Sequence, residues 1–185
     1  MLTIVESIRA EYTRYKALGE GAIAQVADAQ LGESAGAHGN SIATIVWHLS
    51  GNFASRFTDF LTTDGEKPWR NREEEFTRRV VSRDELSQKW EQGWRVLLAA
   101  LDQLSDADLT RSVIIRRQSH LVHEALHRSL AHAAYHVGQI VLLARVFQGE
   151  EWKYLSIPPG GSDAYNQTPT NEHGSAHAAA LRRKA

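Results

Sequence analysis

The stretch HLVHEALHRSLAHAAYHVGQIVLLARVF, residues 120–147, has the apolar spacing of one long amphipathic helix. Gly149 follows shortly after it, where a helix commonly ends. At about 100° per residue, His132 and His136 lie about 40° apart on one face of this helix. That face is otherwise apolar and carries Ala125, Leu143 and Phe147. The stretch therefore predicts a core-facing helix with two histidines on its buried side.

Two histidines four residues apart on a helix bring two ring nitrogens within reach of one cation. The spacing alone also fits two core histidines that are satisfied by hydrogen bonds. A second pair on the same helix, His123 and His127, points roughly to the opposite, charged side and is expected to be exposed or at an interface. The metal interpretation therefore concerns His132 and His136.

A third inward histidine stands in a second predicted helix, which Asn40 or Ser41 caps and which runs to about Leu61. His48 lies at the edge of the apolar stripe of this helix, where it can face a cleft between helices. Alone, such a histidine is more often a structural residue than a metal ligand. Three neutral imidazoles would leave a divalent metal one open or water-filled position, as in catalytic rather than structural sites.

Two further helices are predicted from periodicity, over residues 2–30 and 82–105, and the second of them begins with the Ser-x-x-Glu pattern of a capping box. Residues 62–81 contain turn signals and dense charge without a period, which predicts a long ordered loop. Residues 112–116 hold three β-branched residues and are expected to be extended but too short for a sheet. Four helices with these connections predict an all-α four-helix bundle.

The chain has 185 residues, 42% of them hydrophobic, which fits one domain with a sizeable core. Its 21 basic and 22 acidic side chains nearly cancel, so nucleic acid and anionic membranes are not expected as partners. The absence of cysteine excludes disulfides and thiolate metal sites, which leaves His, Asp and Glu as candidate ligands. No apolar run reaches the roughly 18 residues of a membrane span, so we expect a cytoplasmic protein.

Three stretches carry a resemblance to a known family: WHLSGNF at 47–53, DGEKPWRNREEEF at 64–76 and SLAHAAYHVGQIVLLAR at 129–145. They resemble the DinB-like superfamily, specifically an uncharacterised branch related to bacillithiol-transferase-like proteins. The resemblance covers about residues 1–166, as one DinB-like domain, and implies an up-down-down-up four-helix bundle. Residues 167–185 are expected to form an irregular C-terminal tail, with a weak Ala-rich stretch at 176–181.

The resemblance also implies one divalent metal ion held by His48, His132 and His136, with zinc and nickel as first candidates among the metals that imidazoles accept. Better understood members use the metal to activate a low-molecular-weight thiol for S-transfer or a related reaction. Water in the open position would instead support hydrolysis. The resemblance thus implies a homodimeric, metal-dependent thiol S-transferase or hydrolase that acts on a small molecule. A non-catalytic, stress-related protein that binds a metal or small molecule is the alternative.

Five residues are candidates for substrate contact: Asn52, Trp69, Arg70, Arg72 and Gln139. Arginine can hold a carboxylate through two parallel hydrogen bonds, so the loop residues among them fit an anionic substrate at the mouth of a cleft. A plain solvated loop is an equal alternative. The candidates for a general acid or base are Asp59 and the loop glutamates, although the run Glu73–Glu75 is expected to form a solvated face.

Overall fold

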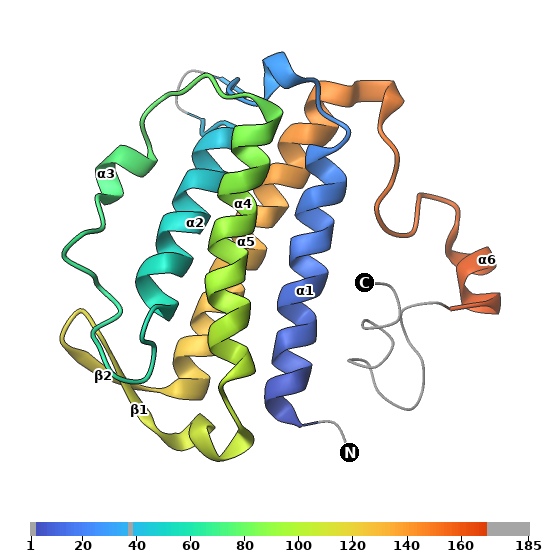
Figure 1. Ribbon diagram of the computed structural model, residues 1–185. Helices are drawn as coiled ribbons and strands as arrows, with labels where there is room; N and C mark the ends of the chain where they lie inside the picture. The colour runs from blue at the N-terminus through green and yellow to red at the C-terminus, as the bar shows by residue number, and fades with distance from the viewer. Residues whose placement is uncertain (1–2, 37–38, 170–185) are drawn as a thin grey trace.

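The computed structural model describes residues 3–36 and 39–169 and is mainly α-helical, as the periodicity predicts (Figure 1). The α-helices of this part of the chain are α1 (Ile4–Ile23), α2 (Ile42–Phe57), α3 (Arg72–Glu75), α4 (Arg83–Asp102), α5 (Val122–Gln148) and α6 (Ser162–Gln167). The same described residues also form three short 3-10 helices, at Asp28–Gln30, Asp106–Thr110 and Gly149–Glu151. Two strands, β1 (Ser112–Ile115) and β2 (Gln118–Leu121), pair in antiparallel fashion.

The four long helices lie side by side around one hydrophobic core (Figure 1). α1 and α5 run in one direction and α2 and α4 in the other, with the most extensive packing between α2 and α4 and between α1 and α5. Because α2 and α4 are parallel neighbours, the chain must return along the length of α2 before α4 begins. Residues 58–82 make this return, and they carry α3 against α2 (Figure 1). The predicted long loop is therefore present, with a short helix inside it.

α1 ends at Ile23, well before the predicted end at Gln30. Arg83, at the start of α4, donates hydrogen bonds to the backbone carbonyls of Ile23 and Val26. The carbonyl of Ile23 also accepts from the backbone N–H of Val26 at 3.2 Å. Carbonyls at a helix end lack the regular i+4 donors of the helix interior, so an arginine that donates to them stabilises the termination. The apolar periodicity continues past Ile23 because Val26 is still buried after the helix has ended.

α2 ends at Phe57 rather than near Leu61. Asp59 has a φ of 50°, which a right-handed helix cannot continue. The predicted caps Ser41, Ser82 and Gly149 are confirmed at the start of α2, the start of α4 and the end of α5. Helix ends that local capping chemistry determines were thus predicted well, whereas this early end was not.

β1 and β2 form a hairpin, so the expectation that residues 112–116 are too short for a sheet was wrong. Two of the residues that pair with β1, His120 and Leu121, had been assigned to the following helix, and α5 therefore starts two residues later than predicted, at Val122. The turn residues Arg116 and Arg117 have φ of 54° and 62°. Both of their backbone N–H groups donate to the carboxylate of Asp64 at 2.8 Å. These two hydrogen bonds attach the hairpin to the loop that follows α2.

A close contact between α2 and α4 depends on Gly93, where a Cβ atom would lie 2.5 Å from the Cα atom of Ser50. Replacing Gly93 with alanine is therefore expected to destabilise the protein by about 1–3 kcal/mol, because backbone on the facing helix would have to move. Urea unfolding followed by circular dichroism measures this. Gln92→Ala, at the exposed neighbouring position, is the control, and equal stability of the two variants would contradict the contact.

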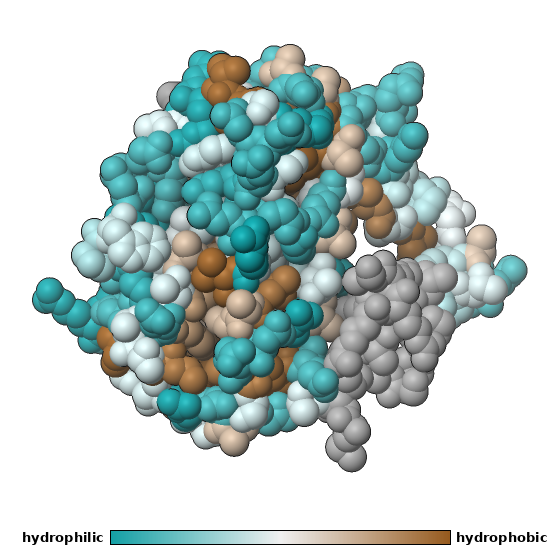
Figure 2. Space-filling view, viewed as in Figure 1, coloured by the Kyte–Doolittle hydropathy of each residue, from teal (hydrophilic) through white to brown (hydrophobic). Residues whose placement is uncertain are grey.

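The C-terminal part contains α6, which the sequence did not predict. The predicted Ala-rich stretch at 176–181 lies outside the described residues, as does the rest of 170–185. The face of the molecule in Figure 2 is mostly hydrophilic, with hydrophobic residues gathered over the lower half of α4.

α5 has an exposed apolar side as well as a buried one. Tyr135, Leu142 and Val146 are all more than half exposed. By length and composition alone, the helical segment Val122–Glu151 would suffice to cross a membrane, with 33% of its most apolar window buried. A core helix of a soluble protein passes the same test, and α5 packs along α1 and α2. The outward side of α5 is nevertheless an apolar surface without a partner in the described part of this chain.

Candidate metal centre

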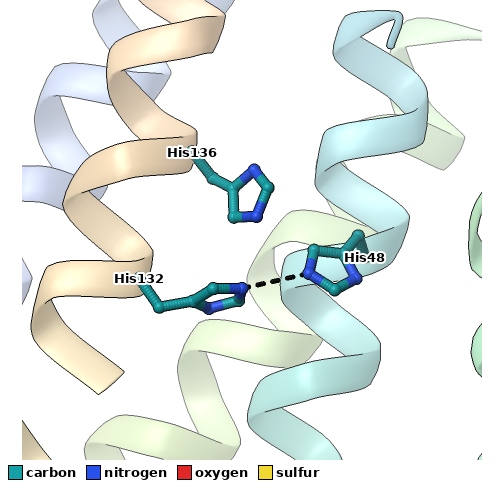
Figure 3. A group of neighbouring side chains, drawn as sticks. All are labelled: His48, His132 and His136. Carbon is teal, nitrogen blue, oxygen red and sulfur yellow. Dashed lines mark hydrogen bonds between the residues drawn. The ribbon is translucent and has the colours of Figure 1, made fainter. Parts of the chain in front are cut away.

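His48, His132 and His136 lie together in the structure, as the sequence predicted (Figure 3). His48 comes from α2 and the other two from successive turns of α5, while the exposed His127 and half-buried His123 do not join them. The three ligand atoms lie within 4.8 Å of one another, and Nε2 of His48 is 3.1 Å from Nε2 of His132. At Zn–N distances of about 2.0–2.1 Å, two ligands of a tetrahedral zinc ion lie about 3.3–3.4 Å apart. The three histidines could therefore hold one metal ion.

Neighbouring acceptors determine which ring nitrogen carries the proton in two of these histidines. Nδ1 of His48 donates to the carboxylate of Glu75 at 3.0 Å, and Nδ1 of His136 donates to the side-chain oxygen of Gln139 at 3.0 Å. A neutral imidazole that donates from Nδ1 keeps its lone pair on Nε2. Acceptors of this kind orient metal-binding histidines and raise their basicity. Both histidines are thus prepared to coordinate through Nε2.

Glu75 is a buried carboxylate that joins the loop to the histidines. Arg70, whose side chain is only 2% exposed, donates to it through Nε at 2.7 Å and through Nη2 at 2.9 Å. Gly51, one turn after His48 on α2, leaves room for this carboxylate, because a Cβ atom there would lie 2.2 Å from its Oε1. Arg70, in the loop before α3, Glu75, at the end of α3, and His48 therefore form one chain of hydrogen bonds that leads to the site.

The charges at the site follow from burial and from these partners. Burial alone would raise the pKa of Glu75, but hydrogen bonds from His48 and Arg70 and the charge of Arg70 hold it below its ordinary value. Glu75 is thus an acceptor at neutral pH and not a general acid. Burial lowers the pKa of His132 to about 3, helped by electrostatic repulsion that a protonated His132 would meet from nearby His136, His48 and Arg70. Burial also lowers the pKa of His136. His132 and His136 are therefore neutral at neutral pH, the form that binds metals.

The metal-free protein is expected to lose stability as the pH falls from about 6.5 toward 3. The unfolded chain protonates His132 near its ordinary pKa of 6.5, whereas the folded protein does so only near 3, so acid favours the unfolded state across this range. Thermal unfolding of metal-free protein at pH 7 and pH 5 measures the loss. His132→Gln removes this titrating group, so a variant that retains the full wild-type pH dependence would contradict the assignment.

The histidines border a pocket of about 410 Å³. Its walls come from α2, the loop around α3, the β-hairpin and α5. Three phenylalanines contribute apolar surface, and its arginines are Arg56, Arg70, Arg72, Arg116 and Arg128. A pocket of this volume accommodates a small molecule rather than a polymer.

Residues 2–161 match the family described as protein of unknown function, DUF1572. This chain belongs to the DUF1572 family. No curated protein and no solved structure matches it. The matched range of the DUF1572 protein includes all four long helices, the hairpin and every residue that lines the pocket.

The five predicted substrate contacts of the DUF1572 protein fall into different places. Asn52, Arg70 and Arg72 line the pocket. Trp69 is 58% exposed and is not among the lining residues. Gln139 also lies outside the lining and instead accepts the hydrogen bond from His136. Arg70 is already paired with Glu75, so its guanidinium is not free to clamp a carboxylate.

Glu75 is the residue of the site that the sequence interpretation missed. Of the run expected to form a solvated face, Glu73 and Glu74 are exposed, but Glu75 is only 5% exposed. The expectation was wrong for Glu75 because α3 is a single helical turn, which places its last residue against α2 while the others face solvent. Asp59, the other acid or base candidate, is exposed and does not line the pocket.

Proposed function

We propose that this DUF1572 protein is a divalent-metal-dependent enzyme and that His48, His132 and His136 bind its one metal ion. One observation carries the proposal: three imidazoles meet beside an open pocket, and acceptors at Nδ1 leave the lone pair of two of them on Nε2. Three protein ligands leave a position for substrate or water, which is the arrangement of catalytic sites. Zinc or nickel is the proposed ion, since imidazole suits both.

We also propose that the four long helices form an up-down-down-up bundle of the DinB-like kind, with residues 1–166 as the domain and 167–185 as its tail. The helix directions support this, since α1 and α5 oppose α2 and α4 (Figure 1). The origin of the candidate ligands supports it too, with one histidine from α2 and a His-x-x-x-His pair from α5. The proposed architecture would place the metal between two helices that approach each other in the core.

The proposed reaction is thiol S-transfer to, or hydrolysis of, a small molecule. A bound divalent ion would lower the pKa of a coordinated thiol or water, so that an anion is available at neutral pH. Glu75 would keep the His48 ring oriented, and Gln139 would do the same for His136. Asn52 and Arg72, which line the pocket, are proposed to contact the substrate. Trp69 is proposed to contact it only at the outer edge of the pocket.

Elemental analysis of purified, tag-free protein tests the metal site. We expect about one divalent ion per chain, and none in a variant with His48, His132 and His136 all replaced by glutamine. Circular dichroism must show that the variant is still helical. A wild-type protein that stays metal-free after divalent ions are offered would contradict the proposal. The three histidines would then be structural residues of the core.

The alternative is a non-catalytic protein that binds a metal or small molecule in the same pocket. The closeness of the three histidines fits both functions, because it bears on the metal and not on turnover. Metal-loaded protein should therefore be screened with low-molecular-weight thiols and with hydrolysable esters and amides. Turnover that disappears in the triple-histidine variant supports the enzyme, whereas stoichiometric metal without turnover of any of these supports the alternative.

We propose that the protein is a cytoplasmic homodimer and that the outward side of α5 forms the dimer interface. Its other proposed partners are small molecules, and neither nucleic acid nor a membrane is among them. The exposed Tyr135, Leu142 and Val146 support the dimer interface, because apolar side chains on one helix face favour burial against another surface. Leu142→Glu is expected to give monomers in light scattering after size exclusion, whereas Val80→Glu, at a fully exposed site elsewhere, should not. Monomeric wild-type protein, or wild-type protein that floats with lipid vesicles, would contradict the proposal.

A further inference from the structure

The pocket beside the histidines carries an excess of positive charge. Five arginines line it, and no carboxylate of the described residues does. Arg70 is neutralised by the buried Glu75 behind the wall. Arg56 and Arg116 share one carboxylate, that of Glu66, at 3.3 and 2.8 Å. Two guanidinium groups therefore compete for a single anionic partner at one side of the pocket.

Arg128 adds a further guanidinium group to the lining of the pocket. It is exposed on α5, lines the pocket, and has no ion pair with any carboxylate in residues 3–36 and 39–169. Arg56 lies deeper, and its burial together with the charges of Arg70 and Arg116 lowers its pKa, although Glu66 opposes this. Guanidinium groups that repel one another in a partly buried pocket would gain from a bound oxyanion.

The backbone at Arg116 indicates that its position is under constraint. Arg116 and Arg117 both occupy the left-handed region, which in two-residue hairpin turns favours Asn-Gly and is unfavourable for arginine by about 1–2 kcal/mol per residue. The two hydrogen bonds to Asp64 stabilise this strained turn. A turn that had only to connect two strands would not require arginine, and strained backbone of this kind concentrates at functional sites. Hydrogen bonds from its backbone N–H to Asp64 and from its side chain to Glu66 hold Arg116 at the pocket.

We propose that this pocket binds a small organic anion, with its carboxylate or phosphoryl group held by Arg56, Arg116 and Arg128 and its reactive end toward the three histidines. The apolar walls, which include Phe57, Phe60 and Ile115, fit a hydrocarbon portion of the ligand. The proposal that this anion is the substrate rests on the proposed function. Binding of the anion itself does not rest on it, because the arginines of the pocket require no metal.

Titration of the metal-free and the zinc-loaded protein, followed by NMR at constant ionic strength, tests this anion site. The probes are glutarate, inorganic phosphate and the neutral glutaramide. Saturable binding of glutarate or phosphate to the metal-free protein, but not of glutaramide, is expected. The tighter of the two anions distinguishes a carboxylate from a phosphoryl ligand, and saturation by either supports the site. No saturable shift with either anion would overturn it.

Arginine variants separate this site from metal binding and from general charge effects. Arg116→Gln and Arg128→Gln are each expected to weaken anion binding about tenfold, because each removes a charge-assisted hydrogen-bond donor. Arg117→Gln removes the same charge from the adjacent turn residue outside the lining, and it should leave the affinity unchanged. Arg128→Gln lies on a helix, so it keeps the test valid if Arg116→Gln disturbs the strained turn.

Two further outcomes would overturn the proposal. Binding only to zinc-loaded protein, with no effect of Arg116→Gln or Arg128→Gln, would make the anion a ligand of the metal alone. An equal loss of affinity in Arg117→Gln would show a general charge effect and no defined site. Failure of the metal proposal gives a different pattern, because a protein that binds no zinc would still bind the anion through Arg116 and Arg128.

Discussion

Replacing Glu75 with alanine is expected to destabilise the metal-free protein by about 3–5 kcal/mol, because Arg70 would remain buried and charged without its partner. The same change removes the acceptor for Nδ1 of His48. The ion pair with Arg70 lies within the loop around α3, and the hydrogen bond to His48 joins this loop to α2. Without them, α3 should detach from the site as well. Urea unfolding of metal-free protein, followed by circular dichroism, measures the free energy.

Two variants give this experiment its controls. Glu73→Ala removes a carboxylate of the same loop whose side chain is 88% exposed, and it should change stability by less than about 0.5 kcal/mol. Replacing both Arg70 and Glu75 with methionine removes the pair together, so no unpaired charge stays buried and most of the lost stability should return. A Glu75→Ala protein as stable as Glu73→Ala would show that the buried pair does not hold the loop.

The three histidines could be predicted from sequence because helical periodicity gives the angle of each side chain around its own helix. His132 and His136 fall on the inner face of α5 by that rule alone, and His48 falls at the edge of the apolar face of α2. Their meeting across two helices could not be derived from the periodicity of either one. It followed from the resemblance, and the structure confirms that the three side chains lie together.

Glu75 could not be predicted because its environment is formed by a loop that carries no periodic signal. Its partner His48 is 27 positions away in the sequence. One local signal was present: Gly51 stands inside a helix, where glycine is unfavourable by about 1 kcal/mol relative to alanine and often has a packing reason. The structure gives that reason, since Gly51 makes room for the carboxylate. The glycine marks a contact without identifying the residue that makes it.

The arginines of the hairpin were missed for a related reason. Arg116 and Arg117 form a tight turn without the Asn-Gly or Asp-Gly pattern by which such turns are recognised. The stabilising partner, Asp64, lies 52 positions before Arg116. The resulting strand pairing also moved the start of α5 away from the predicted position. Local propensity failed here because a long-range contact stabilises a locally unfavourable turn.

Adding zinc to the metal-free protein is expected to raise its melting temperature by about 8–16 °C when free zinc is about 1,000 times the dissociation constant. At that ratio, a ligand that binds only the folded state stabilises it by about 4 kcal/mol. Differential scanning calorimetry at fixed pH measures the shift. The triple variant with His48, His132 and His136 replaced by glutamine should show no shift.

The orientation of His136 predicts an intermediate result for Gln139→Leu. This variant keeps all three histidines but removes the acceptor for Nδ1 of His136. No hydrogen bond then keeps the ring proton on Nδ1 and the lone pair on Nε2. Loss of such an acceptor weakens metal binding about 10–100-fold, which at the same free zinc reduces the stabilisation by about 1.4–2.7 kcal/mol. Gln148→Leu, near the end of the same helix, should keep the wild-type shift. A Gln139→Leu protein with the full shift would mean that packing alone orients the ring, and an equal shift in the triple variant would place the zinc elsewhere.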